Sequence, residues 1–189
     1  MKRVLLGAML VTLFVSCGKS PEEKANALIE KEVKKALYHP ETYDPVETRI
    51  DSAFTPFDDP VFYEKTVQLY KLGMSVDKKE TDIKVKKLTD ELKTIIDEEP
   101  QFIGFKARHR YRANNNVGKT VFGEMEFLFD KNVNKILAIY DMGDFEYKAV
   151  QIIYRQLHGE DVQMEDEFVY ELYKMLFSRF GTYAKIGRE

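Results

Sequence analysis

Three histidines and a few neighbouring polar residues carry most of the acid–base chemistry that this sequence offers. The histidines, His39, His109 and His158, lack a spacing that would let two of them bind one metal ion. His109 lies on the apolar side of an alternating, strand-like segment, together with Tyr111. If the next strand places Gly123 opposite His109, the missing side chain leaves room for a small cleft. His109, Tyr111 and Gly123 therefore form the candidate cleft of this chain.

The sequence offers His109 no recognisable catalytic partner. It contains neither an HExxH motif nor a G-x-S-x-G nucleophile elbow, and Cys17 is its only cysteine. A lone histidine on the apolar side of a strand is more often a hydrogen-bonded core residue than a general base. We therefore predict no catalytic residues, no metal ion and no cofactor. A periplasmic enzyme with a small cleft around His109 is the alternative.

The segment Ala113–Thr120, with the sequence ANNNVGKT, matches the permissive form of the phosphate-binding loop. Ile136–Tyr140 followed by Asp141 also imitates the strand that ends in a magnesium-binding aspartate. A phosphate-binding loop leads into a helix, whose first amides bind the phosphates. Here Val121–Phe129 alternates like a strand, so Asn115–Gly118 is predicted to be a hairpin connection. Nucleotide binding through Ala113–Thr120 is a minor alternative.

A second polar segment imitates a calcium-binding loop. Asp130, Asn132 and Asn134 have the spacing of the first three ligands, and Asp141 lies at the twelfth position. Two requirements fail, because Lys135 stands where the turn needs glycine and the last ligand is not a glutamate. We expect a polar turn between two strands.

Glu124 and Glu126 share one face of a predicted strand, like a pair of catalytic carboxylates. The preceding strand carries Lys106 and Arg108 on its charged side. If the two strands fold back about Asn116, Arg108 faces Glu124 and Lys106 faces Glu126. Opposite charges directly across a strand pair contribute about 0.2–1 kcal/mol each. Ion pairing is therefore the simpler explanation of the two glutamates.

Alternating segments predict an antiparallel sheet that would position these side chains. The region 102–141 predicts a meander of three strands that are joined by polar turns. The segment 46–54 predicts a fourth strand. Its predicted buried side consists of Val46, Thr48, Ile50, Ser52 and Phe54.

A capped helix is predicted to begin at Pro21 and to cover the sheet. Ser20 can act as the N-cap, Pro21 suits the first helical position, and Glu23 completes a capping box. Ile29 and Val33 recur at helical spacing on one face. A helix packed on an antiparallel sheet of about four strands is an α+β fold. This arrangement resembles the cystatin-like and NTF2-like architectures, a topological resemblance that implies no activity.

The remaining segments predict further helices. Proline and glycine positions and apolar spacing predict a helical hairpin at 59–99, inserted between two strands. Two more helices are predicted at about 144–157 and 163–180. The predicted organisation is an α+β domain at 21–141 that contains the insertion, followed by a C-terminal helical extension at 142–189.

The first residues of the chain predict export. Lys2 and Arg3 precede the uncharged segment Val4–Val15, in the order that is typical of a secretory signal peptide. This apolar segment is shorter than the roughly 20 residues that a membrane-spanning helix needs. We therefore predict that residues 1–16 are a signal peptide that is cleaved from the mature protein.

The segment Phe14–Cys17, with the sequence FVSC, resembles the lipobox of bacterial lipoproteins, with Phe14 where that pattern usually has leucine. The resemblance implies that Cys17 carries a diacylglycerol, that acyl chains such as palmitate hold the protein to a membrane, and that 17–20 is a lipidated tether. Gly18 and Lys19 resemble the context of outer-membrane lipoproteins. The chain as a whole is similar to envelope lipoproteins of Bacteroidota, a similarity that implies no activity.

The amino-acid composition argues against some classes of function. The chain has 29 basic and 32 acidic residues, and two of the basic ones, Lys2 and Arg3, belong to the predicted signal peptide. This excess of acid argues against nucleic-acid binding, which needs a concentrated basic surface. Lipidation of the only cysteine would leave none for a disulfide. The 13 phenylalanines and 11 tyrosines must therefore supply a packed core.

Together these features predict an exported protein that is anchored by lipid to a bacterial membrane, namely the outer membrane. We expect a non-catalytic binding or structural module of the cell envelope. Its expected partners are the membrane, through the N-terminal lipid, and either another envelope protein or a small molecule in a cleft between helix and sheet.

Overall fold

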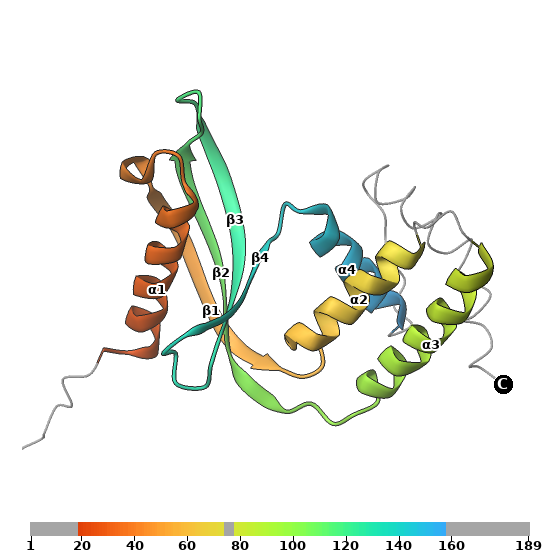
Figure 1. Cartoon of the computed structure of the whole chain (residues 1–189). Coiled ribbons are helices and arrows are strands. Elements are labelled where there is room, and N and C mark those ends of the chain that lie inside the picture. The colour runs from red at the N-terminus through yellow and green to blue at the C-terminus, as the bar shows by residue number, and fades with distance from the viewer. Residues whose placement is uncertain (1–18, 74–77, 158–189) are drawn as a thin grey trace, which may run out of the picture.

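The computed structural model describes residues 19–73 and 78–157 (Figure 1). Cys17, the predicted signal peptide and the helix predicted at 163–180 lie outside these residues. None of the described helices combines the length and apolar character needed to span a bilayer. The elements, in chain order, are α1 (Pro21–Ala36), the short 3-10 helix η1 (Pro40–Thr42), β1 (Asp44–Phe54), α2 (Pro60–Gly73), α3 (Lys78–Ile96), β2 (Phe102–Asn114), β3 (Thr120–Phe129), β4 (Ile136–Asp141) and α4 (Phe145–Leu157).

Helix α1 begins at the predicted capping box. The Ser20 hydroxyl accepts a hydrogen bond from the Glu23 backbone N–H (3.1 Å), and the Glu23 carboxylate accepts one from the Ser20 N–H (2.8 Å). These bonds satisfy donors that the first helical turn leaves unpaired. The fully buried residues of the helix recur at intervals of four, and they are Ala25, Ile29 and Val33.

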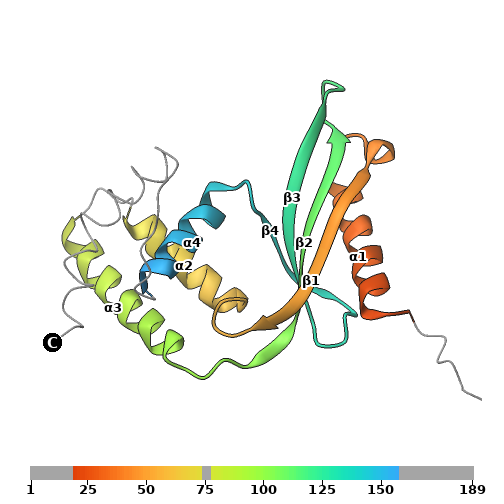
Figure 2. The same cartoon turned by 180° about the vertical axis from the view of Figure 1, so that it is seen from behind.

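The four strands form one antiparallel meander in the order β1-β2-β3-β4. Helix α1 lies along one face of this sheet (Figures 1 and 2). The α+β class predicted from the sequence is therefore confirmed. The cluster that α1 and the sheet bury together, here called the sheet core, consists of Ala25, Ile29, Val33, Ala107, Phe127, Phe129 and Val133.

The pairing of β2 with β3 differs from the predicted register by two residues. Arg108 lies opposite Glu126, and Arg110 lies opposite Glu124. The connecting turn is closed by a hydrogen bond between the backbones of residues 115 and 119, so it is centred on residue 117 rather than 116. Moving the fold-back point by one residue moves the pairing by two, and the predicted register was therefore wrong.

The burial of residues at both ends of β1 differs from the predicted pattern. The pairing with β2 is interrupted between Pro45 and Glu47 and again between Ala53 and Phe54. Val46 and Phe54, predicted to be buried, are 44% and 42% exposed, whereas Ala53 is fully buried. At the first shift Val46 is the extra residue and has no partner on β2, whereas at the second shift the extra residue, Ile103, belongs to β2. Ala53 lies on the face of β1 opposite to the predicted buried side.

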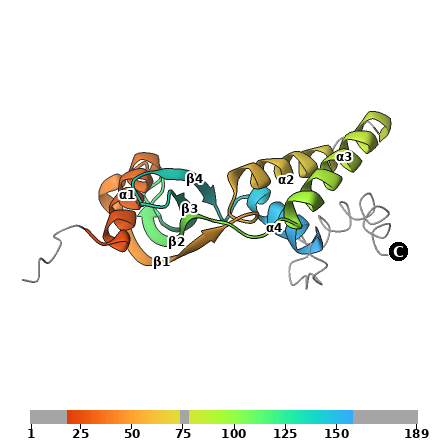
Figure 3. The ribbon, with the colours of Figure 1, turned by 90° about the horizontal axis from the view of Figure 1, so that it is seen from below.

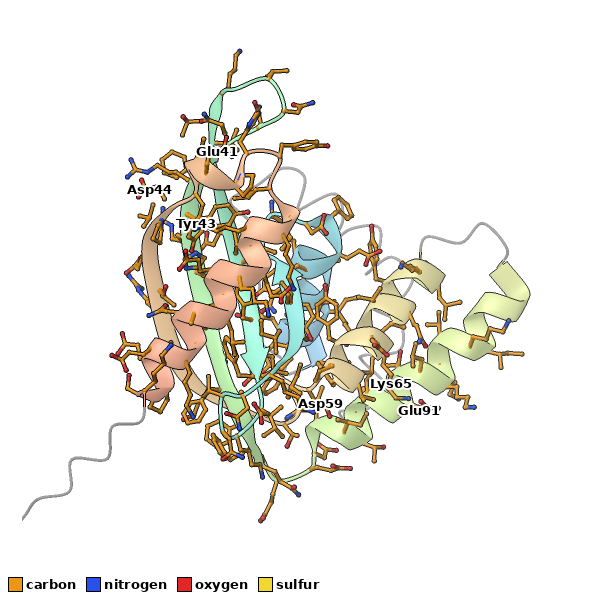
Figure 4. The ribbon with its side chains drawn as sticks, turned by 60° about the vertical axis from the view of Figure 1, so that its left-hand side comes forward. Glu41, Tyr43, Asp44, Asp59, Lys65 and Glu91 are labelled. Atoms are coloured by element: carbon orange, nitrogen blue, oxygen red, sulfur yellow. The ribbon has the colours of Figure 1, made fainter. Side chains whose placement is uncertain are left out.

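Helices α2, α3 and α4 form a second unit beside the sheet (Figure 3). Helices α2 and α3 are the hairpin predicted between two strands, and the Lys65 ammonium on α2 binds the Glu91 carboxylate on α3 at 2.6 Å (Figure 4). Helix α4 packs on the same hairpin. The buried residues of this helical unit are Phe62, Leu69, Tyr70, Val85, Leu88, Leu92, Ala149, Ile152 and Ile153. They form a hydrophobic cluster separate from the sheet core.

Candidate functional site

His109 lies in the packed interior of the sheet, where it is 1% exposed. The Tyr43 hydroxyl hydrogen-bonds with its Nε2 at 2.9 Å, and the Thr48 hydroxyl hydrogen-bonds with its Nδ1 at 3.0 Å. Tyr43 reaches it from the segment between α1 and β1 (Figure 4). Burial lowers the pKa of His109, so its imidazole is neutral at pH 7. With both nitrogens engaged, the side chain ties β2 to β1.

Gly123 lies opposite Tyr111, whereas His109 lies opposite Met125. A Cβ atom at Gly123 would overlap the Tyr111 ring, so this ring fills the space that the missing side chain leaves. The structure therefore brings Tyr111 and Gly123 together and separates Gly123 from His109. This arrangement offers no support for an enzyme built around His109.

The segment that imitates a phosphate-binding loop is a hairpin turn. The Asn115 side-chain oxygen accepts hydrogen bonds from the backbone N–H groups of Val117 (3.1 Å) and Lys119 (3.0 Å). Gly118 has a φ of 76°, which glycine adopts without steric cost. Thr120 begins strand β3 rather than a helix, so the predicted hairpin connection is confirmed.

The segment that imitates a calcium-binding loop is also a turn. The Asp130 carboxylate accepts hydrogen bonds from the backbone N–H groups of Lys135 (3.0 Å) and Asn134 (2.7 Å), and these bonds lower the pKa of Asp130. The carboxylate oxygen that accepts both bonds is thus engaged by the turn. Within residues 19–73 and 78–157, no three His, Cys, Asp or Glu side chains are grouped as metal ligands would be.

Glu126 has a different partner from the one predicted. The Lys106 ammonium, its predicted partner, binds the Asp58 carboxylate at 2.9 Å. The Glu126 carboxylate instead accepts a hydrogen bond from the Tyr147 hydroxyl of α4 at 3.3 Å. The ion pair that explained Glu126 in the sequence is therefore replaced by a bond between the sheet and the helical unit.

Two more tyrosines lie beside Glu126, where the sheet meets the helical unit. The rings of Tyr63 on α2 and Tyr140 on β4 have centroids 4.2 Å apart, and those of Tyr140 and Tyr147 are 6.3 Å apart. Burial raises the pKa of all three hydroxyls, that of Tyr63 to about 12. We call Glu126 and these three tyrosines the junction cluster. Its hydroxyls remain protonated donors at neutral pH.

Burial also raises the pKa of the Glu126 carboxyl. The folded state therefore favours the protonated acid, and this contribution to stability is lost as the pH rises from the ordinary carboxyl range through the folded pKa. We expect Glu126→Gln, which cannot ionise, to raise the free energy of unfolding relative to the natural chain at pH 7 more than at pH 4. Denaturant unfolding at both pH values measures this difference.

Glu124→Gln is the matched control for this prediction. Glu124 lies on the same face of β3, is 40% exposed at its side chain and has the Arg108 guanidinium at 3.9 Å. We expect the pH-dependent gain to be specific to Glu126. An equal gain from both variants would show that general charge on this face, and not the burial of Glu126, governs stability there.

The junction cluster is a structural connection rather than an open site. Tyr147 is only 6% exposed, and its hydroxyl donates a hydrogen bond to the Glu126 carboxylate. Sequence reasoning missed the cluster because Tyr63 and Tyr147 belong to helices whose position against the sheet is set by tertiary packing. The signal available in the sequence was the apolar residues that surround Glu126.

An open groove runs between α1 and the edge strand β4. Its volume is about 540 Å³, and it is lined by Leu28 and Glu32 of α1 and by residues 134–139. Leu137 and Ile139 are 42% and 41% exposed. The groove combines apolar side chains with the edge of a sheet, so it is the candidate binding site among the described residues.

The assignment of the groove as the candidate binding site rests on the geometry of the chain, because comparisons with known proteins add nothing to it. The cystatin-like and NTF2-like resemblance stays a prediction. No protein-family model, no curated protein sequence and no solved structure matches the chain.

Proposed function

We propose that this chain is an exported lipoprotein that is anchored through Cys17 to the outer membrane and serves as a non-catalytic binding module of the cell envelope. The observation that carries the proposal is the order of a positively charged start, an uncharged segment, a cysteine and a capped helix within the first 23 residues. Two or three acyl chains on one cysteine suffice for stable membrane attachment, whereas a single chain binds only marginally.

The start of α1 supports a body held close to the membrane. Ser20 already caps the helix, so only residues 18–20 separate Cys17 from folded structure, a span of at most about 10 Å. Helix α1 has 16 residues and is about 24 Å long. The turn between β2 and β3 lies at the other end of the sheet from the start of α1 (Figure 1). In this orientation the sheet extends away from the bilayer.

The described interior supports binding rather than catalysis. His109 and Glu126, the two buried groups that could exchange protons, are hydrogen-bonded to hydroxyls of neighbouring elements. The groove beside β4 combines a strand edge and apolar side chains with the polar residues Glu32, Asn134 and Lys135. The Glu32 carboxylate is paired with the Lys35 ammonium at 2.7 Å, so the groove is better suited to holding a partner than to proton transfer.

Metabolic labelling with radioactive palmitate tests the anchor. We expect the full-length chain, expressed in a bacterial host, to incorporate label and to stay with membranes in plain buffer. Cys17→Ser should lose all of the label and leave the membrane fraction, because Cys17 is the only thiol in the chain.

A second variant provides the matched control. Cys17→Ser combined with Ser52→Cys restores one thiol on strand β1, outside the predicted lipobox. This chain should remain unlabelled. Release of the natural chain from membranes in plain buffer, with residues 1–16 removed, would contradict the proposal.

A further inference from the structure

The two edges of the sheet differ in how they are protected against pairing with another strand. The edge strand β1 has register shifts at both ends. It carries one proline and four charged side chains, which are Pro45, Asp44, Glu47, Arg49 and Asp51. Charges, prolines and bulges are the features that keep natural sheet edges from pairing. Strand β4 has one register shift, with Leu137 as the extra residue, but it carries no proline and no charged side chain between Lys135 and Asp141.

The outer edge of β4 presents unpaired backbone groups. The Met142 N–H donates to the Glu124 carbonyl at 3.0 Å. Because inward and outward hydrogen bonding alternate along an antiparallel strand, the N–H and C=O groups of Ile139 and the N–H group of Asp141 point away from β3. The Asp141 carbonyl accepts a hydrogen bond from the Asp144 N–H at 3.0 Å. Among the described strands none lies beyond β4, so the two Ile139 groups and the Asp141 N–H have no strand partner there.

The side chains along this edge are apolar and continuous with the sheet core. Ile139 lies opposite Phe127, which is fully buried, yet Ile139 itself is 41% exposed. Leu137 and the α1 residue Leu28 extend the same apolar surface into the groove. A strand added beside β4 would cover this surface and would also pair the free backbone groups.

We propose that the β4 edge binds an extended segment of a partner protein as a fifth, antiparallel strand. This inference rests on the proposed function and names the partner of the binding module. The charges at the two ends of β4 set the direction of the segment. A basic residue at its N-terminal end would face Asp141, an acidic residue at its C-terminal end would lie near Lys135, and apolar residues would cover Ile139 and Leu137.

A second copy of the chain fits this edge less well. Two β4 strands paired antiparallel are related by a two-fold axis that reverses the strand direction. Helix α1 runs along the strands (Figure 2), so the two N-termini would point in opposite directions. Two chains anchored by those N-termini in one membrane face cannot adopt this pairing.

A synthetic peptide tests the inference directly. The probe is fluorescein-labelled Arg-Thr-Val-Thr-Val-Thr-Glu, added to the full chain extracted from membranes in detergent micelles, with binding followed by fluorescence anisotropy. We expect saturable binding. Methylating the peptide amide that faces the Ile139 carbonyl should weaken binding at least 10-fold, whereas methylating an amide on the other edge of the peptide should leave it within 2-fold. Exchanging the terminal Arg and Glu should weaken it several-fold.

A protein variant gives a second readout. Ile139→Lys places a charge in the groove and should weaken peptide binding at least 10-fold. Ile83→Lys, at a 74% exposed isoleucine of α3 outside the groove, is the matched control and should bind normally. If Ile139→Lys fails to fold, the methylated peptides still decide the question with the natural chain.

Three results would overturn the inference. The first is the absence of saturable binding, and the second is equal binding by the two methylated peptides. The third is self-association of the chain, measured by sedimentation in micelles, that Ile139→Lys abolishes, because a second copy would then occupy the edge. Palmitate labelling and membrane retention are measured on the same chain, so a failed anchor and a failed groove give separable outcomes.

Discussion

Replacing Phe127 with alanine is expected to lower the free energy of unfolding by about 3–5 kcal/mol. Phe127 is fully buried between α1 and the sheet, and its ring packs near those of Phe129 and His109, with centroids 6.4 Å away in both cases. Truncation removes the apolar contacts of the ring and leaves a cavity that the surrounding strands and helix can only partly close. Denaturant unfolding followed by circular dichroism measures the loss.

Phe122→Ala is the matched control for Phe127→Ala. Phe122 lies on the same strand, β3, but is 72% exposed. Removing an exposed ring deletes few contacts, so we expect a change within about 0.5 kcal/mol. Similar losses at both positions would mean that β3 is not buried as described. Because Phe127 also lies opposite Ile139, its removal should loosen the strand that forms the candidate groove.

Gly104→Ala is expected to lower the free energy of unfolding by about 3 kcal/mol or more. A Cβ atom at Gly104 would overlap the backbone carbonyl oxygen of Phe129. A backbone atom cannot rotate away as a side chain can, and Gly104 also pairs with the fully buried Ala53 on the other side. Relief would require β2 to move away from β1 or β3. Thermal and denaturant unfolding of the variant test this.

Gly118→Ala separates the clash from the general effect of replacing a glycine. Gly118 has a φ of 76° in the turn between β2 and β3, and nothing lies within 4 Å of a Cβ atom placed there. Only the cost of a left-handed backbone remains, about 1–2 kcal/mol. A loss at Gly104 no larger than the loss at Gly118 would contradict the close approach of β2 to the end of β3.

The predictions for Glu126 and for Ile139 concern two different parts of the fold. The sheet core and the helical unit each bury their own apolar residues, and the junction cluster connects them through Tyr147 and Glu126. The groove lies on the α1 side of the sheet, away from this connection. We therefore expect changes at Glu126 to alter stability without altering peptide binding, and changes at Ile139 to alter peptide binding.

Local sequence determined where most elements begin and end. Ser20 and Glu23 bond to each other's backbone within one helical turn, and Asn115 bonds to amides two and four residues away. Interactions of this range depend only on the chain geometry of a few residues. The α+β class, the capped helix, the inserted hairpin and the meander were predictable for this reason.

Only the tertiary structure decided which distant side chains meet. The turn between β2 and β3 is centred on residue 117 and not, as predicted, on residue 116. This difference places Arg108 opposite Glu126. Lys106 pairs with Asp58, 48 residues away, and Glu126 accepts a hydrogen bond from Tyr147 of α4. The groove likewise exists only because α1 packs beside β4. Such contacts depend on how whole elements dock against one another, which residue spacing along the chain does not encode.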